Sequence, residues 1–117
     1  MNKKLTPKYK YSGVYMIRNE RTGKVYIGSS CDIESRIAEH RRTLAKGKHI
    51  CRDLQHDYDL RHPFTTHVLY VEAVPSNKRT ANRRRIYAME WKFIEQYDAI
   101  NRGYNRLGMC ENTKKAL

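Results

Sequence analysis

Reactive side chains recur along the chain at positions that a small fold could bring together: Tyr15, Tyr26, Arg36, His40 and Glu90. A phenol or an imidazole can accept or deliver a proton during a reaction. A guanidinium matches two oxygens of a phosphate group, and a carboxylate is a common ligand of hard metal ions. Each of these residue types also has an ordinary structural use, so the elements that carry them decide between the interpretations.

The two tyrosines are expected on neighbouring strands of a hairpin. Residues 11–18 and 24–28 are rich in β-branched and aromatic side chains, and the polar stretch 19–23 between them ends in glycine. Because side chains alternate between the two faces of a strand, Tyr15 and Tyr26 each share a face with a glycine of their own strand. A glycine inside a strand often marks the close approach of a ligand or another backbone. A hairpin of aromatic core residues is the alternative.

The helix that follows is expected to aim two polar groups at this hairpin. Asp32 is a suitable N-cap, and three apolar residues then recur at helical spacing: Ile33, Ile37 and Leu44. His40 falls in the middle of that apolar stripe, and Arg36 falls on its flank. The alternatives are a core histidine with satisfied hydrogen bonds and an arginine paired with a carboxylate.

Glu90 is expected inside a long helix that starts at Asn77 or Thr80 and ends near Tyr97. Its position is in the middle of the apolar stripe of that helix, which is formed by Ile86, Phe93, Ile94 and Tyr97. Burying an unpaired carboxylate costs several kcal/mol, so Glu90 needs a partner. That partner could be Arg36, a neighbouring lysine or a divalent metal ion.

The rest of the chain predicts a second helix, a third strand and a closing loop. The second helix is predicted from apolar residues at a spacing of four and should end before Pro63; these residues are Ile50, Leu54 and Tyr58. Its opposite face is polar and is expected to face solvent, with Arg52, Gln55, His56, Asp59 and Arg61. The strand covers residues 65–74 and places on one face His67, Leu69 and Val71. Residues 99–108 are expected to form a loop that contains Asn105.

Composition favours a polyanionic partner. The chain has 117 residues, with 24 Lys and Arg against 12 Asp and Glu and a net charge of +12. Nucleic acid is the usual partner of such a protein. No long apolar segment and no secretory signal is visible, which predicts a cytoplasmic protein without a membrane span, and the scattered cysteines are expected to be reduced thiols. We expect a basic arm at 1–10, one domain at 11–108 and a tail at 109–117.

The order of these motifs resembles the GIY-YIG nuclease family, and most closely the catalytic domain of phage homing endonucleases. The resemblance rests on two strand motifs followed by single positions: Gly13-Val14-Tyr15, Tyr26-Ile27-Gly28, Arg36, His40, Glu90 and Asn105. Valine replaces the isoleucine of the first motif. Two further runs recur in those phage enzymes, namely Lys46-Gly47-Lys48-His49 and Gly103-Tyr104-Asn105.

The resemblance implies an α+β fold in which a three-stranded antiparallel sheet is flanked by helices in the order β-β-α-α-β-α. It implies a DNA endonuclease that hydrolyses phosphodiester bonds with one divalent ion, Mg²⁺ or alternatively Mn²⁺, held by Glu90. Arg36 would hold the phosphate, Tyr15 assisted by His40 would deprotonate the water, and Tyr26 would help to place it. For this role the site must lower the pKa of Tyr15, which is about 10 in water. Whether Tyr15 or His40 is the base stays open.

Supporting roles are expected for Gly13, Gly28, Lys24, His49 and Asn105, with Asn105 more structural than catalytic. Contacts to the DNA backbone are expected from Lys46, Lys48, Lys78, Arg79, Arg83 and Arg84. A restriction or repair-type nuclease of the same chemistry, a ribonuclease and a non-catalytic DNA-binding module are the alternative functions. Because one such site cuts one strand, a homodimer or a separate specificity partner is also considered.

Overall fold

The computed structural model describes residues 10–74 and 79–106. The predicted tail, Lys78 and all but the last residue of the predicted basic arm lie outside these ranges. The described elements are β1 (Lys10–Asn19), β2 (Val25–Ser30), α1 (Ile33–Ala45), α2 (Arg52–Asp59), β3 (Phe64–Val74), α3 (Arg79–Gln96) and α4 (Ala99–Arg102).

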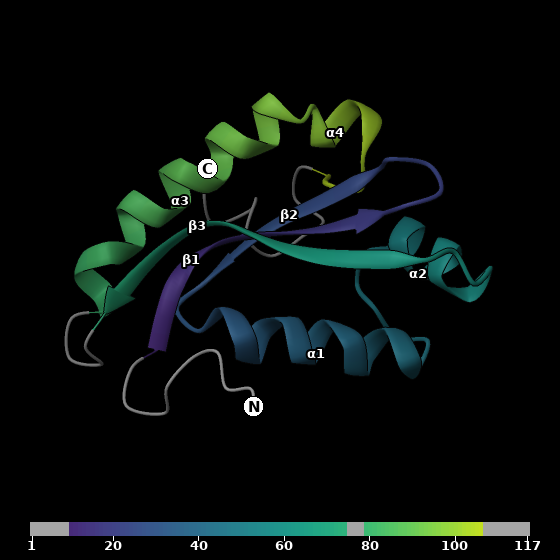
Figure 1. The fold of residues 1–117 in the computed structure, drawn as a ribbon, viewed down its shortest axis with the longest axis horizontal. Coiled ribbons are helices and arrows are strands. Elements are labelled where there is room, and N and C mark those ends of the chain that lie inside the picture. Colours follow the sequence, from purple (N-terminus) through teal and green to yellow (C-terminus); the bar gives the residue numbers. More distant parts are fainter. Residues whose placement is uncertain (1–9, 75–78, 107–117) are drawn as a thin grey trace.

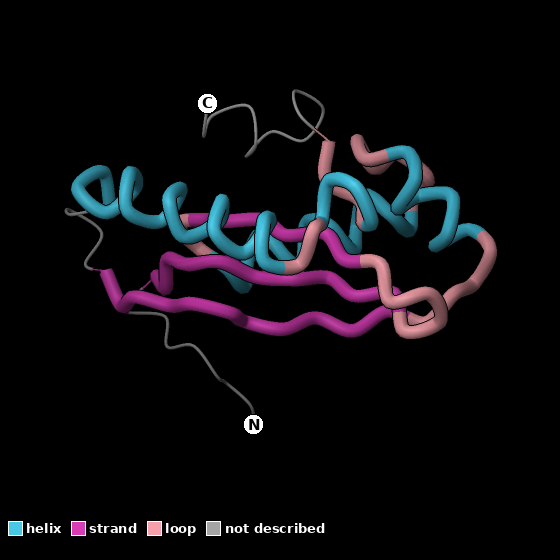
Figure 2. Tube along the Cα trace, turned by 90° about the horizontal axis from the view of Figure 1, so that it is seen from above, coloured by secondary structure: helices cyan, strands magenta, loops and turns pink. Residues whose placement is uncertain are grey.

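The three strands form one antiparallel sheet in the order β2-β1-β3, with β1 in the centre. In Figure 1 the helices α3 and α4 lie above the sheet, α1 lies below it, and α2 lies at the right-hand end of the strands. Figure 2 looks down from the side of α3 and shows this helix running along the length of the strands. The predicted α+β fold with helices flanking a three-stranded sheet is therefore confirmed.

Alternation along the strands divides the core into two clusters, one on each face of the sheet. On the face of α1 and α2, Tyr15 and Tyr26 pack with apolar residues of both helices, among them Ile37 and Leu54. On the opposite face, a second cluster joins the other side of β1 and β2 to α3 and α4, with Val14, Met16, Ile27, Ile86, Ile94 and Ala99. The sheet thus presents both predicted tyrosines to α1, the helix expected to carry the arginine and the histidine.

A β-bulge alters the predicted faces of β3. Val14 is paired with Tyr70 and Tyr15 with Val68, so Leu69 is an extra residue on β3. Leu69 therefore packs in the α3 cluster, whereas Val71 is 49% exposed. The prediction that Leu69 and Val71 share a face is wrong, because the bulge breaks the strict alternation.

Gly13 permits the two strands to approach at this bulge. A Cβ atom on Gly13 would lie 1.9 Å from the backbone oxygen of Tyr70. Any side chain at this position would push β3 away from β1, so the first glycine of the hairpin is required by the packing of the sheet.

The second helix and the closing segment differ from their predicted forms. Ile50 lies before α2 and is 56% exposed, and Tyr58 is 37% exposed, so the buried side chains of α2 are Leu54 and Gln55. The placement of Gln55 on the solvent face is therefore wrong. The segment predicted as a loop contains the short helix α4 (Ala99–Arg102) before it reaches Asn105.

Asn105 completes the free edge of β2. Its side-chain Oδ1 accepts a hydrogen bond from the backbone N–H of Ile27 at 2.9 Å, and its Nδ2 donates to the carbonyl of Ile27 at 2.9 Å. The backbone N–H of Tyr104 also donates to the carbonyl of Val25 at 2.9 Å. The side-chain amide thus acts as a peptide group of an additional strand, in agreement with the structural role expected for this residue.

Replacing Asn105 with alanine is expected to lower the free energy of unfolding by about 2–4 kcal/mol, because two buried backbone groups of Ile27 would lose their partner. Urea unfolding followed by circular dichroism measures this loss. Asn101→Ala is the matched control, because Asn101 is exposed and its side chain bonds only to the nearby carboxylate of Asp98 in the described contacts. An equal loss in both variants would show that the amide of Asn105 does not support β2.

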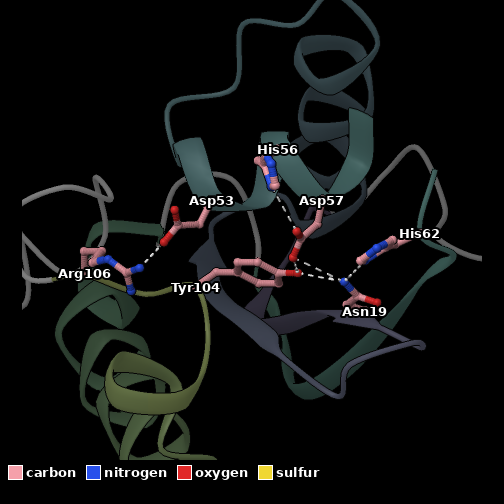
Figure 3. A network of polar contacts seen from close by, with 7 residues as sticks. All are labelled: Asn19, Asp53, His56, Asp57, His62, Tyr104 and Arg106. Atoms are coloured by element: carbon pink, nitrogen blue, oxygen red, sulfur yellow. Dashed lines mark hydrogen bonds and ion pairs between the residues drawn. The ribbon is translucent and has the colours of Figure 1, made fainter. Parts of the chain in front are cut away.

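A polar network ties the β1–β2 turn to α2 and to the closing segment. Figure 3 shows Asn19 at its centre, where Nδ2 lies 2.9 Å from both the Tyr104 hydroxyl and Nδ1 of His62. The Tyr104 hydroxyl donates to Asp57 Oδ2 at 2.6 Å. These contacts fix the segment that delivers Asn105 to β2.

Two sequence-based expectations concern the cysteines and membranes. Cys51 is disulfide-bonded and Cys31 is free, so the prediction of a reduced thiol is wrong for Cys51. In the described part of the chain no helix combines the length and apolarity that crossing a bilayer requires.

Candidate active site

Tyr15 and Tyr26 lie side by side between the sheet and α1. Both side chains are fully buried, and their ring centroids are 6.5 Å apart. Gly28 is paired with Tyr15 across the strands, and a Cβ atom on it would lie 2.4 Å from the Tyr15 hydroxyl oxygen. The second glycine therefore leaves space for the Tyr15 hydroxyl on the surface of β2.

His40 of α1 contacts both tyrosines. Its Nε2 lies 2.6 Å from the Tyr15 hydroxyl oxygen, and its ring is edge-on to that of Tyr26 with centroids 5.3 Å apart. Its other nitrogen, Nδ1, lies 2.7 Å from Nε2 of His49. The predicted inward orientation of His40 is confirmed, and His49 stands directly behind it.

The segment that enters α2 holds His49 in place. The backbone N–H of Cys51 donates to His49 Nδ1 at 3.0 Å, and the backbone N–H of His49 donates to Gln55 Oε1 at 2.9 Å. Gln55 also donates to the carbonyl of Leu44 at 3.1 Å, which joins α2 to the end of α1. Sequence reasoning missed Gln55, because a glutamine on an amphipathic helix gives no signal of being buried.

Arg36 opens onto a cleft beside the histidine pair. Its Nη1 forms an ion pair with Glu39 Oε1 at 2.7 Å, and its positive charge also acts on the Tyr15 hydroxyl. The cleft has a volume of about 190 Å³ and is lined by Arg36, Glu39, His40, Thr43, Lys48, His49 and Ile50. A guanidinium and an ammonium at the rim of such a cleft suit an anionic ligand.

Replacing Glu39 with glutamine is expected to raise affinity for duplex DNA about two- to five-fold, since an exposed ion pair contributes about 0.2–1 kcal/mol. The carboxylate of Glu39 competes with any phosphate that approaches Arg36. Fluorescence anisotropy of a labelled duplex in EDTA measures the affinity. Glu34→Gln is the control, because it removes the same charge from an exposed position of the same helix that does not line the cleft. An equal gain in both variants would attribute the effect to net charge alone.

Glu90 lies on α3, which packs on the other face of the sheet from the two tyrosines. It is fully buried, and its Oε1 accepts a hydrogen bond from Ser29 Oγ at 3.0 Å. Its Oε2 has no hydrogen-bond partner, and the hydroxyl of Tyr26 is in the same situation. Burial raises the pKa of the Glu90 carboxyl to about 8. The Glu90 carboxyl thus has one oxygen without a partner, and its charge acts on Tyr15 and Tyr26. A buried carboxyl of this kind lacks the cation that would stabilise its charged form.

Burial dominates the proton equilibria of the other groups. It raises the pKa of the Tyr15 phenol well above its ordinary value, although Arg36 acts in the opposite direction. Burial, assisted by the charge of Arg36, lowers the pKa of His40 to about 3 and that of His49 to about 4. The expectation that the site lowers the pKa of Tyr15 is therefore wrong for the ligand-free protein. His40 is neutral at pH 7 because its lowered pKa lies far below neutrality.

The other predicted basic residues that the structure describes lie at the surface. Lys24 is exposed, with its Nζ 5.8 Å from the centroid of the Tyr104 ring. Lys46 and Lys48 are exposed after α1, and Arg83 and Arg84 are exposed on α3. The side chain of Arg79 is not described. Among residues 10–74 and 79–106, no three His, Cys, Asp or Glu side chains gather as a metal-ligand set.

The strand pair with its two tyrosines and the buried glutamate on α3 define a family. The model of the GIY-YIG catalytic domain matches residues 11–105, and the chain belongs to the GIY-YIG nuclease family.

Individual relatives agree with this assignment. Over 94 residues the chain is 31% identical to intron-associated endonuclease 1 of Enterobacteria phage T4, which corresponds to 80% of this chain and 36% of that protein. The chain thus spans about a third of the length of that relative. Two structures of the catalytic domain of the intron and homing endonuclease I-TevI are also similar. A mutant has a TM-score of 0.68 at 30% identity, covering 81% of this chain and 92% of that one. The other has a TM-score of 0.65 at 32% identity, covering 80% and 96%.

Proposed function

We propose that this chain is a DNA endonuclease that hydrolyses phosphodiester bonds with one divalent metal ion held by Glu90. The observation that carries the proposal is the buried carboxylate with an unpartnered Oε2, whose charge acts on both tyrosines. A structural glutamate would be paired with a cation, but Arg36 forms its ion pair with Glu39 instead. A metal ion bound by Glu90 in the active protein would account for the oxygen that has no hydrogen-bond partner.

Magnesium fits this donor set. Mg²⁺ prefers oxygen ligands, retains several waters, and is usually held by one or two carboxylates together with phosphate oxygens. Glu90 supplies one carboxylate, and the described residues offer no larger set of ligands. The bound ion would neutralise negative charge that develops on the phosphate, and Mn²⁺ is an alternative with the same preference for oxygen.

The other residues of the site have distinct tasks in this proposal. Arg36 binds the non-bridging oxygens of the scissile phosphate, displacing Glu39. With the metal ion and phosphate bound, Tyr15 would first release its phenol proton to solvent. The phenolate would then take a proton from the attacking water, whose oxygen bonds to phosphorus while the bond to the leaving oxygen breaks and that oxygen gains a proton from solvent. The Tyr26 hydroxyl, which has no partner in the ligand-free site, orients the water or the phosphate.

DNA is the proposed substrate because exposed cations flank the cleft and the net charge of the chain is +12. Lys48 lines the cleft itself. The phage relative is named an endonuclease, and we extend a homing-endonuclease-like activity to this chain. A restriction or repair-type role uses the same chemistry. A cytoplasmic site of action and a second copy or a partner that supplies specificity are parts of the proposal that need their own tests.

Incubation with supercoiled plasmid tests the proposal. Cleavage is expected in Mg²⁺, loss of cleavage in excess EDTA, and recovery when Mg²⁺ is restored. Glu90→Gln protein purified in the same way controls for a contaminating nuclease. Nicked product indicates that one site acts alone, and linear product indicates that two sites act together.

A second substrate separates the alternatives. A labelled single-stranded RNA of matched length is incubated in parallel, and preferential cutting of the RNA would overturn the choice of DNA. If the plasmid is bound but remains intact in Mg²⁺ and Mn²⁺, and several unrelated plasmids give the same result, the chain is a DNA-binding module and the nuclease proposal fails.

A further inference from the structure

The contacts around His40 form a chain of hydrogen bonds that starts at a fixed donor. The backbone N–H of Cys51 can only donate, and it points at Nδ1 of His49 at 3.0 Å. That nitrogen must therefore be the unprotonated acceptor. Since burial and the charge of Arg36 lower the pKa of His49 to about 4, the ring is neutral at pH 7 and carries its single hydrogen on Nε2.

The hydrogen on His49 in turn determines the tautomer of His40. His49 Nε2 lies 2.7 Å from Nδ1 of His40, so the hydrogen on His49 is donated and His40 Nδ1 is the acceptor. His40 is also neutral at pH 7, because burial lowers its pKa to about 3. Its single hydrogen is then on Nε2, which faces the Tyr15 hydroxyl oxygen at 2.6 Å.

The end of the chain is the oxygen of Tyr15. It accepts a hydrogen bond from His40 Nε2, and the positive charge of Arg36, whose guanidinium has no acceptor atom, also acts on it. Neither of these two groups can therefore accept a proton from this oxygen. An oxygen that faces a donor and a positive charge is stabilised when it carries negative charge.

We propose that His49 is a positioning residue that sets the tautomer of His40 through the backbone amide of Cys51, and that His40 thereby serves Tyr15 as a hydrogen-bond donor and not as a proton acceptor. The reverse direction would place a hydrogen on Nδ1 of His49 against the N–H of Cys51, at a separation of 3.0 Å. Two donors facing each other in a buried site lose both hydrogen bonds. The tautomers follow from the contacts of two neutral rings, and only their consequence for catalysis rests on the proposed nuclease function.

Nuclear magnetic resonance tests the tautomers without DNA or metal. Two-bond ¹H–¹⁵N correlation spectra of the ¹⁵N-labelled protein at pH 7 distinguish the protonated nitrogen of each ring from the unprotonated one. Signals are assigned with single histidine substitutions. We expect His40 and His49 both to carry hydrogen on Nε2 and none on Nδ1. Hydrogen on Nδ1 of either ring, or a doubly protonated ring, would overturn the proposal even if the protein cuts DNA.

Substitution of His49 tests the coupling between the rings. His49→Phe removes the donor to His40, so His40 should become a mixture of tautomers and the turnover number should fall at least about ten-fold, with DNA affinity changed less than two-fold. His49→Gln restores an amide donor close to the position of Nε2. It should therefore recover most of the single His40 tautomer and most of the turnover number. His56→Gln is the control, because the side chain of His56 is 71% exposed and outside this chain of hydrogen bonds.

The outcomes are distinct. An unchanged His40 tautomer in folded His49→Phe protein shows that His49 does not set it, and the proposal fails. If the tautomers are as expected in the wild type and no variant cuts DNA, including the wild type, the proposed function fails while the assignment of hydrogen positions stands.

Discussion

Glu90→Gln protein is expected to bind DNA normally, to lose at least about 10³-fold in the rate of cleavage, and to be more stable than the wild type above about pH 5. The loss of cleavage follows from the loss of the anionic ligand for the metal ion. The Oε1 atom of a glutamine can still accept the hydrogen bond from Ser29, so the fold has no reason to change. A substitution that abolishes activity and raises stability indicates that the original residue has a chemical role and not a structural one.

The difference in stability between Glu90→Gln and the wild type is expected to grow as the pH rises. Burial raises the pKa of Glu90 in the folded protein to about 8, from 4.5. Between these values the unfolded chain has released the proton that the folded protein still holds, so the wild type loses stability as pH rises through this window. Glutamine does not titrate. The variant should equal the wild type near pH 4 and exceed it by about 2–4 kcal/mol at pH 8.

Urea unfolding at pH 4, 6 and 8 without metal measures this difference. Glu95→Gln, an exposed glutamate on α3, should show no such trend. Excess Mg²⁺ should stabilise the wild type and leave Glu90→Gln unaffected, since binding to the folded state alone adds stability. A variant that is less stable than the wild type at pH 8 would mean that Glu90 is an ordinary, partnered core residue.

Tyr15→Phe is expected to lower the turnover number by about 10²–10⁴-fold, the range that a positioned acid or base contributes. The change removes the oxygen that faces His40 Nε2 at 2.6 Å and Arg36. It should also lower the free energy of unfolding by about 1–3 kcal/mol, because the buried N–H of His40 loses its partner.

Tyr26→Phe provides the comparison for Tyr15→Phe. The hydroxyl of Tyr26 is buried without a hydrogen-bond partner, so its removal should leave stability unchanged or slightly raised. Single-turnover cleavage and urea unfolding of both variants separate catalysis from folding, and Tyr97→Phe controls for an exposed tyrosine. Full activity of Tyr15→Phe would exclude the phenol as the base and overturn its assigned task.

The buried polar residues were predictable because helical periodicity is a strong signal. Apolar stripes on both sides of His40 and Glu90 made their inward orientation unavoidable, and both are buried in the structure. The strand pair carrying Tyr15 and Tyr26 was predictable for a similar reason, because β-branched residues, a polar turn and two glycines all favour one hairpin. The resemblance to the family then joined these positions into one site.

The rest depended on contacts that sequence patterns do not encode. The bulge at Leu69 changes which face of β3 each side chain occupies, and Gln55 is buried because His49 and Leu44 offer it backbone partners. The pKa values moved against expectation for one physical reason. Nearby charges were considered for Tyr15, but the loss of water around a buried phenol outweighs the charge of Arg36.

The amide of Asn105 also has a consequence for the order in which the protein is made. Ile27, between Tyr26 and Gly28, obtains partners for its outward N–H and carbonyl only from a residue 78 positions later in the chain. During synthesis, β2 therefore has an open edge until nearly the whole domain has been translated. A nascent chain that lacks Asn105 cannot hold the tyrosine pair in its final geometry, so the ability to cut nucleic acid is expected only after Asn105 has been translated.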